Sequence, residues 1–184
     1  TPNAACFVDA HHAQGVLTAL KHFPGHGNAV DDSHYGFTDV TKRWKPEELA
    51  PFRELIRSGR ADMVMMAHIF NERIDPEYPA TLSRVTIQDL LRGELGFDGV
   101  VITDDMYMNA IIERYSIEEA VVLAINAGVD MMIFGNNINT GFVPDRPDRI
   151  IRIIVDAVKA GKIHPERLVE ANRRIERLAK SSKK

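Results

Sequence analysis

The sequence has little cysteine, no long apolar run and no strong excess of either charge. Cys6 is the only cysteine, so an internal disulfide framework is excluded and the redox compartment stays undecided. No apolar stretch approaches the roughly 20 residues that a membrane-spanning helix needs, and no membrane span is expected. A formal net charge of -3 over 184 residues argues against nucleic acid or an anionic membrane as the main partner.

Several cofactor and metal motifs are also missing. Neither GxGxxG nor GxxxxGK(S/T) occurs, so a nucleotide cofactor is unsupported, and we expect no cofactor. No HxH or HExxH pattern occurs, and His22 and His26 are separated by Pro24 and Gly25, so they do not share a helical face. We therefore expect no metal site. Because seven histidines have carboxylates nearby, a metal-dependent hydrolase stays open as the alternative.

The composition is that of an ordinary globular protein, with 45% hydrophobic and 27% charged residues. Strand-like apolar segments occupy residues 16–23, 62–69, 99–105 and 130–135. The last three are near-continuous, which is typical of strands buried on both faces of a parallel sheet. Amphipathic segments predict helices at residues 45–56, 83–95, 116–126, 148–159 and 165–179. Residues 1–14 are predicted to begin irregularly and to end in a short helical piece.

The order of strand, loop and helix repeats four times at intervals of roughly 35–45 residues, the scale of a βα unit. Four units are half of a (β/α)8 TIM barrel, which typically has about 250 residues, and they also suffice for a small doubly wound sheet. Polar residues follow every strand. They are Lys21 and His22, then His68, then Asp104 and Asp105, then Asn136 and Asn137. In a barrel all four strand ends converge on one face, which favours the barrel.

The loop after the first strand has an unusual density of titratable groups. Residues 21–27 read Lys-His-Phe-Pro-Gly-His-Gly, and Asp31, Asp32 and His34 follow closely. Burying so many ionisable groups costs free energy unless each has a partner, so such clusters are typical of functional sites. A carboxylate on Asp32 that accepts from the His34 ring would fix that ring and let it transfer a proton near neutral pH.

Asp104 is the second residue that could take part in catalysis. It ends a buried strand, where a rigid scaffold can direct it as a nucleophile or an electrostatic stabiliser. The structural alternative is a helix N-cap, since aspartate is favoured there. For the neighbouring Asp105 we favour capping.

These segments resemble the signature of family 3 glycoside hydrolases of the β-N-acetylglucosaminidase type. Residues 21–27 followed by Asp32-Ser33-His34 resemble one motif, and residues 90–106, which end in Thr-Asp-Asp-Met, resemble the nucleophile strand with its lead-in. Shorter matches follow the same order, at residues 66–69, 79–83 and 127–130. The resemblance extends over nearly the whole chain and implies that residues 1–184 are part of a single TIM-barrel catalytic domain.

The resemblance also implies a mechanism. Asp104 would be the nucleophile of a retaining glycosidase that forms a covalent glycosyl-enzyme, with His34 as general acid/base oriented by Asp32. A histidine would then replace the carboxylic acid that most glycosidases use. An anionic nucleophile with a neutral acid/base also leaves room for phosphate as the acceptor in place of water.

The implied partner is a carbohydrate. Lys21 and His22 would hold sugar hydroxyls, and His68 would line the site. The family's usual substrate is a terminal β-linked N-acetylglucosamine, often on peptidoglycan fragments recovered during wall recycling.

The length departs from the family pattern, because members carry a complete barrel. This chain corresponds to the second half, strands 5–8 with their helices. The first half would supply an aspartate and an arginine that grip the non-reducing sugar. An inactive half-barrel fragment is therefore a further alternative. Two open sheet edges would invite pairing with another copy or with the missing half.

Overall fold

A computed structural model describes residues 1–30, 33, 36–135 and 142–181. At its centre is a sheet whose four strands are all parallel and follow the chain order. The strands are β1 (Ala19–Phe23), β3 (Met63–Met66), β5 (Val100–Asp105) and β6 (Met131–Ile133). All four lie within the segments predicted from the sequence, and the parallel α/β class is confirmed. The sequence did not indicate a second, two-stranded parallel sheet made of β2 (Thr38–Asp39) and β4 (Ile69–Phe70).

Helical segments alternate with the strands, as predicted. They are α1 (Pro2–His12), η1 (Pro46–Leu49), α2 (Ala50–Arg57), η2 (Ala80–Leu82), η3 (Val85–Glu94), α3 (Asn109–Ile112), α4 (Ile117–Ala127), α5 (Arg146–Lys159) and α6 (Pro165–Ser181). The ends of α4 follow the sequence rules, because the Ser116 hydroxyl accepts the Glu119 N–H and Gly128 has a φ of 116°. The predicted helix at residues 83–95 is present as the π-helix η3.

The irregular start predicted for residues 1–14 is wrong. Helix α1 begins at Pro2 and continues to His12. Proline is accepted in the first helical turn, where its missing N–H would have no partner in any case. Val8 of α1 is 3% exposed and belongs to the apolar core, whereas Phe7 of the same helix is 61% exposed.

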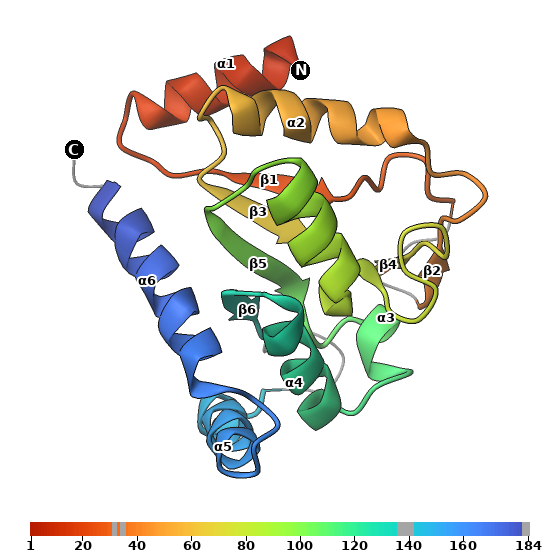
Figure 1. Ribbon diagram of the computed structural model, residues 1–184, viewed down its shortest axis with the longest axis vertical. Helices are drawn as coiled ribbons and strands as arrows, with labels where there is room; N and C mark the ends of the chain where they lie inside the picture. The colour runs from red at the N-terminus through yellow and green to blue at the C-terminus, as the bar shows by residue number, and fades with distance from the viewer. Residues whose placement is uncertain (31–32, 34–35, 136–141, 182–184) are drawn as a thin grey trace.

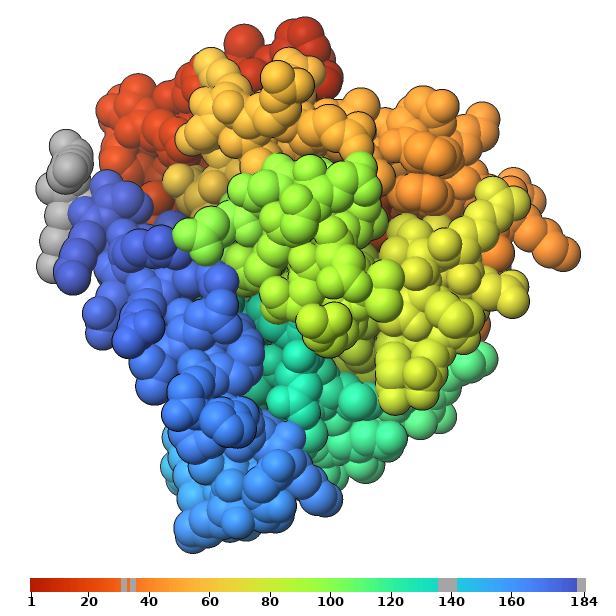
Figure 2. Space-filling view, viewed as in Figure 1, coloured from red at the N-terminus to blue at the C-terminus, as the bar shows by residue number. Residues whose placement is uncertain are grey.

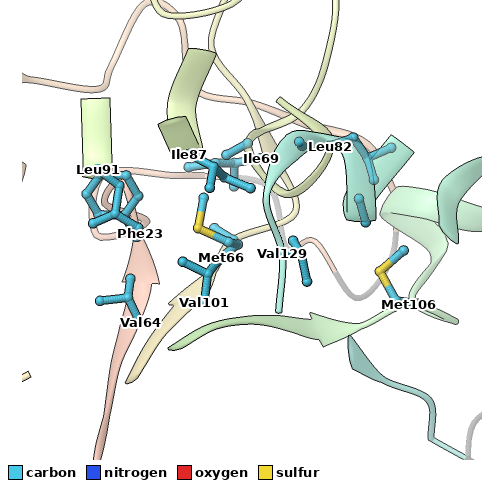
Figure 3. Packing of buried hydrophobic residues seen from close by; sticks show 14 of the residues in the cluster. Phe23, Val64, Met66, Ile69, Leu82, Ile87, Leu91, Val101, Met106 and Val129 are labelled. Atoms are coloured by element: carbon cyan, nitrogen blue, oxygen red, sulfur yellow. The ribbon is translucent and has the colours of Figure 1, made fainter. Parts of the chain in front are cut away.

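Helices cover one face of the four-stranded sheet (Figure 1). The side chains that point to this face are buried, among them Leu20, Val64 and Val101. In Figure 3, Met66 and Val101 of the strands point toward Ile87 of η3. Figure 2 shows this side of the molecule, whose surface combines η3, α2 and α6 from distant parts of the sequence. The apolar core lies between the sheet and these helices.

The other face, which we call the open face, is not sealed by the described residues. Its apolar side chains are only partly buried, as in Met63, Met65 and Ile102, and Met131 is 36% exposed. The register aligns Met65 with Ile102 and Ile102 with Met131, so these side chains form a row across the sheet. A doubly wound sheet has helices on both faces, whereas a barrel has them outside only. The arrangement is that of a barrel segment, although the strands described here do not close.

No helix within the described ranges has both the length and the apolar character needed to cross a membrane.

A buried ion cluster closes the end of the sheet where the strands begin. The Asp130 carboxylate has no exposed surface and contacts three guanidinium groups, at 2.8 Å from Arg92, 2.5 Å from Arg167 and 3.4 Å from Arg174. It also accepts the N–H of Val101 at 3.0 Å. These contacts join β5, η3 and α6 at the residue that precedes β6. In barrels this end of the sheet serves stability, and the opposite end carries the site.

Replacing Asp130 is therefore expected to destabilise the fold strongly. Asp130→Asn leaves three buried guanidinium groups without their shared carboxylate, which costs about 3–5 kcal/mol in the free energy of unfolding. Chemical denaturation measures this value. The matched control is Asp145→Asn, whose exposed carboxylate lies 3.9 Å from Arg152, and which should change the free energy by about 1 kcal/mol or less. Equal effects of the two substitutions would contradict the structural role of the cluster.

Candidate active site

A cavity of about 820 Å³ opens at the carboxyl ends of β1 and β5. Its polar lining is concentrated in a few side chains that come from three segments of the chain. These are Lys21, His22, His26, Ser33, Glu48 and Asp104. Because parallel strands end at the same edge, residues more than 80 positions apart meet here, as the strand-end pattern predicted.

The end of β1 is built to turn the chain into this cavity. Pro24 and Gly25 end the strand, and Gly25 has a φ of 122°. A Cβ at Gly25 would lie 2.5 Å from the Cβ of Glu48, so only glycine lets η1 approach so closely. The Trp44 indole N–H donates to the Pro24 carbonyl at 3.0 Å, and Phe23 packs edge-on against Phe52. These contacts fix where the loop leaves the sheet.

Lys21, His22 and Asp104 lie together, as predicted. Nε2 of His22 is 3.4 Å from Oδ2 of Asp104, and both side chains keep about a quarter of their surface exposed, 29% and 26%. The pairing of β1 with β3 is irregular between Leu20 and Phe23, and both Lys21 and His22 line the cavity. Asp104 is in phase with Ile102, which places it on the open face.

Neither aspartate at the end of β5 caps a helix. The N-cap of α3 is Met108, which makes no side-chain capping bond. Oδ1 of Asp104 accepts the Asp105 N–H at 2.8 Å, which leaves Oδ2 toward His22. The Asp105 carboxylate accepts the N–H groups of Tyr107 and Gly135, both at 3.0 Å. Asp105 thus joins the ends of β5 and β6 and does not cap α3, contrary to the capping role that we favoured.

His68 does not line the cavity, in contrast to its predicted place. It is 2% exposed, and both ring nitrogens have partners. Nδ1 lies 2.8 Å from the Thr81 hydroxyl, and Nε2 lies 3.0 Å from the Asp105 carbonyl. Burial lowers the pKa of His68 to about 4, although the negative charges of Asp104 and Asp105 and the bond to the Asp105 carbonyl oppose this effect. The ring is therefore neutral at neutral pH.

Strand alternation carries no signal for this position. β3 ends at Met66, and the next three residues, Ala67, His68 and Ile69, are all buried, at 1%, 2% and 1% exposed. The alternation of buried and partly buried side chains in β3 therefore does not continue to His68.

Asp32 and His34, the predicted proton-transfer pair, lie outside the described residues, and so do Asn136 and Asn137. Sequence reasoning missed Glu48, whose carboxylate lines the cavity and accepts the Gly27 N–H at 3.2 Å and the Asn28 amide at 3.0 Å. Since its oxygens are held by N–H donors, Glu48 anchors the start of the loop.

The described ranges contain no group of three or more His, Cys, Asp or Glu side chains placed to hold a metal ion.

Comparison with known proteins identifies relatives of this arrangement. The sequence pattern of the family described as glycosyl hydrolase family 3 N-terminal domain matches residues 2–178. A β-hexosaminidase of Tolumonas auensis is 39% identical over 137 residues, which are 73% of this chain and 41% of that protein. The chain thus spans less than half the length of this relative.

Two solved structures are also similar. A glycoside hydrolase family 3 β-N-acetylglucosaminidase from a Paenibacillus species has a TM-score of 0.84 and 38% identity, over 95% of this chain and 33% of that one. The Zn-bound CbsA of Thermotoga neapolitana has a TM-score of 0.81 and 34% identity, over 91% of this chain and 36% of that one. The TIM-barrel type of fold is confirmed by this likeness.

The burial of a neutral His68 predicts a pH-dependent stability. The unfolded chain binds a proton on this residue below pH of about 6.5, whereas the folded chain does so only near pH 4. The free energy of unfolding should therefore fall as the pH is lowered from 6.5 to 4, by up to about 3 kcal/mol from His68. Denaturation curves of the wild type and His68→Gln, measured across this range, isolate the contribution. Parallel curves for the two proteins would contradict it.

Proposed function

Because the chain belongs to family 3 of the glycosyl hydrolases, we propose that it forms part of a β-N-acetylglucosaminidase. The substrate is a terminal β-linked N-acetylglucosamine, and the enzyme is a retaining exo-glycosidase. One observation carries the proposal most directly. Asp104 lies near the carboxyl end of β5, and its carboxylate lines the cavity on the open face, beside His22.

In the proposed reaction Asp104 is the nucleophile. Its carboxylate attacks the anomeric carbon, and the bond from that carbon to the glycosidic oxygen breaks, which leaves a covalent glycosyl-enzyme. Oδ1 is held by the Asp105 N–H, so Oδ2 is the oxygen available for attack. Lys21 and His22 hold sugar hydroxyls at the rim of the same cavity. Two successive inversions at the anomeric carbon then retain its configuration.

His34, oriented by Asp32, is the proposed general acid/base. It gives a proton to the leaving oxygen in the first step and takes one from the attacking water in the second. Glu48 is a poor candidate for this work because N–H groups occupy both of its oxygens. Phosphate can replace water as the acceptor, and its addition to the assay would then yield a sugar 1-phosphate.

The proposed substrates in the cell are peptidoglycan fragments that carry a terminal N-acetylglucosamine. This class follows from the family resemblance, and turnover of purified muropeptides tests it.

We further propose that residues 1–184 are one half of a single catalytic barrel. The open face exposes apolar side chains. In a packed barrel such side chains are covered by layers of side chains from the remaining strands. In the part of the chain that the structure describes, β1 and β6 are the edge strands of the main sheet, so further parallel strands would pair there, from the other half of the polypeptide or from a second copy.

The test of the nucleophile is Asp104→Ala in a polypeptide that carries these residues within a complete barrel. On an aryl β-N-acetylglucosaminide, kcat should fall by about 10³-fold or more, because the covalent step is lost. Asp89→Ala, which removes an exposed carboxylate of η3, is the control and should leave kcat unchanged.

Full activity of Asp104→Ala would remove this residue from the mechanism. The 184-residue chain is also assayed alone, and its sedimentation coefficient is measured. These two measurements distinguish an inactive fragment from a self-associating barrel. Activity that is abolished by exhaustive chelation would instead favour the metal-dependent alternative.

The role of His34 as general acid is tested by assaying His34→Ala on two substrates that differ in their leaving group. For an activated aryl leaving group kcat/KM should stay near the wild-type value, since that group departs without a proton. For a natural disaccharide kcat/KM should fall by about 10²–10⁴-fold. The control is His164→Ala, which changes an exposed histidine paired with Glu166. Equal activity of the variant on both substrates, at the wild-type level, would end the proposed role.

A further inference from the structure

We infer that His68 is a positioning residue for Asp104, acting through the backbone of Asp105, and that it does not touch the sugar. The inference rests on the proposed function, because it takes Asp104 to be the nucleophile.

The contacts run through one residue. Nε2 of His68 lies 3.0 Å from the carbonyl oxygen of Asp105, and the N–H of that same residue donates to Oδ1 of Asp104 at 2.8 Å. The ring therefore holds the backbone of the residue whose N–H fixes the rotation of the nucleophile's carboxylate. A change in the orientation of Asp105 would be passed directly to the attacking oxygen of Asp104.

The direction of these bonds follows from the donors present. A carbonyl oxygen only accepts, so Nε2 of His68 carries the hydrogen. The other ring nitrogen, Nδ1, lies 2.8 Å from the Thr81 hydroxyl oxygen. That hydroxyl donates its one hydrogen to the Ala67 carbonyl at 2.8 Å, which keeps Thr81 in place. Thr81 and Asp105 thus fix the orientation of the ring through its two nitrogens.

Burial argues against contact with a ligand. His68 is 2% exposed, Thr81 has no exposed surface, and neither lines the cavity that Asp104 faces. His68 lies beyond the end of β3, where its ring contacts Thr81 and the Asp105 backbone, whereas Asp104 lines the cavity. The Asp105 backbone thus connects the two side chains.

The chain itself provides the first test, by amide hydrogen exchange in His68→Leu and His68→Gln. Leucine removes the donor to the Asp105 carbonyl, whereas the glutamine amide can replace Nε2. We expect the Asp105 amide to exchange about tenfold faster or more in His68→Leu and near the wild-type rate in His68→Gln. The Val101 amide, held by Asp130 at the other end of β5, controls for global unfolding. Unchanged protection of Asp105 in His68→Leu would overturn the inference.

Kinetics in a complete barrel provides the second test. Misplacement of the nucleophile should lower kcat of His68→Leu by about 10- to 100-fold with KM within about threefold of wild type, and His68→Gln should recover most of the loss. A sugar-binding role would instead raise KM in both variants and would overturn the inference.

If His68→Leu does not fold, Thr81→Val serves in its place, because it keeps the volume and removes only the hydroxyl. It should speed Asp105 exchange and lower kcat in the same direction, and no change in either would refute the inference. Failure of the proposed function is recognised separately. It would appear as an inactive wild-type barrel or an active Asp104→Ala, while the exchange result stands independently of turnover.

Discussion

Asp105 is the residue on which the geometry of the strand ends depends. Its carbonyl accepts from His68 after β3, its carboxylate accepts from Gly135 after β6, and its own N–H holds Asp104. Three neighbouring strands are thereby tied at one residue directly beside the proposed nucleophile. Such a tie matters because a shift of about 1 Å in a reacting group can cost about 10²-fold in rate.

Much of the fold could be predicted because its signals are local. Apolar runs gave the four strands of the main sheet, and Ser116 and Gly128 marked the ends of α4. The pairing of β2 with β4 could not be predicted, since two residues carry no periodicity. The site was predicted in part. Strand-end position located Lys21, His22 and Asp104 at the cavity, but it does not tell whether a side chain beyond the strand is buried, and His68 is buried.

The two ends of the sheet divide the work of stability and chemistry. Asp130 and its three arginines hold β5, η3 and α6 together where the strands begin, in a cluster with almost no exposed surface. The cavity at the opposite end is lined by loops and by side chains that keep part of their surface in solvent. Loops at the cavity can therefore vary in sequence while the cluster keeps the sheet intact.

The open face also sets the chemical fate of the methionines. Met66 and Met106 have no exposed surface, whereas Met63, Met65 and Met131 lie on the face of the sheet that the described residues leave open. A thioether that solvent can reach is converted to the sulfoxide by peroxide, and the added oxygen makes an apolar side chain polar. The three methionines are thus an oxidation-sensitive patch for as long as nothing covers them. If the proposed remaining strands close the barrel over this face, they shield these methionines, and the extent of oxidation would then report on whether the proposed barrel has formed.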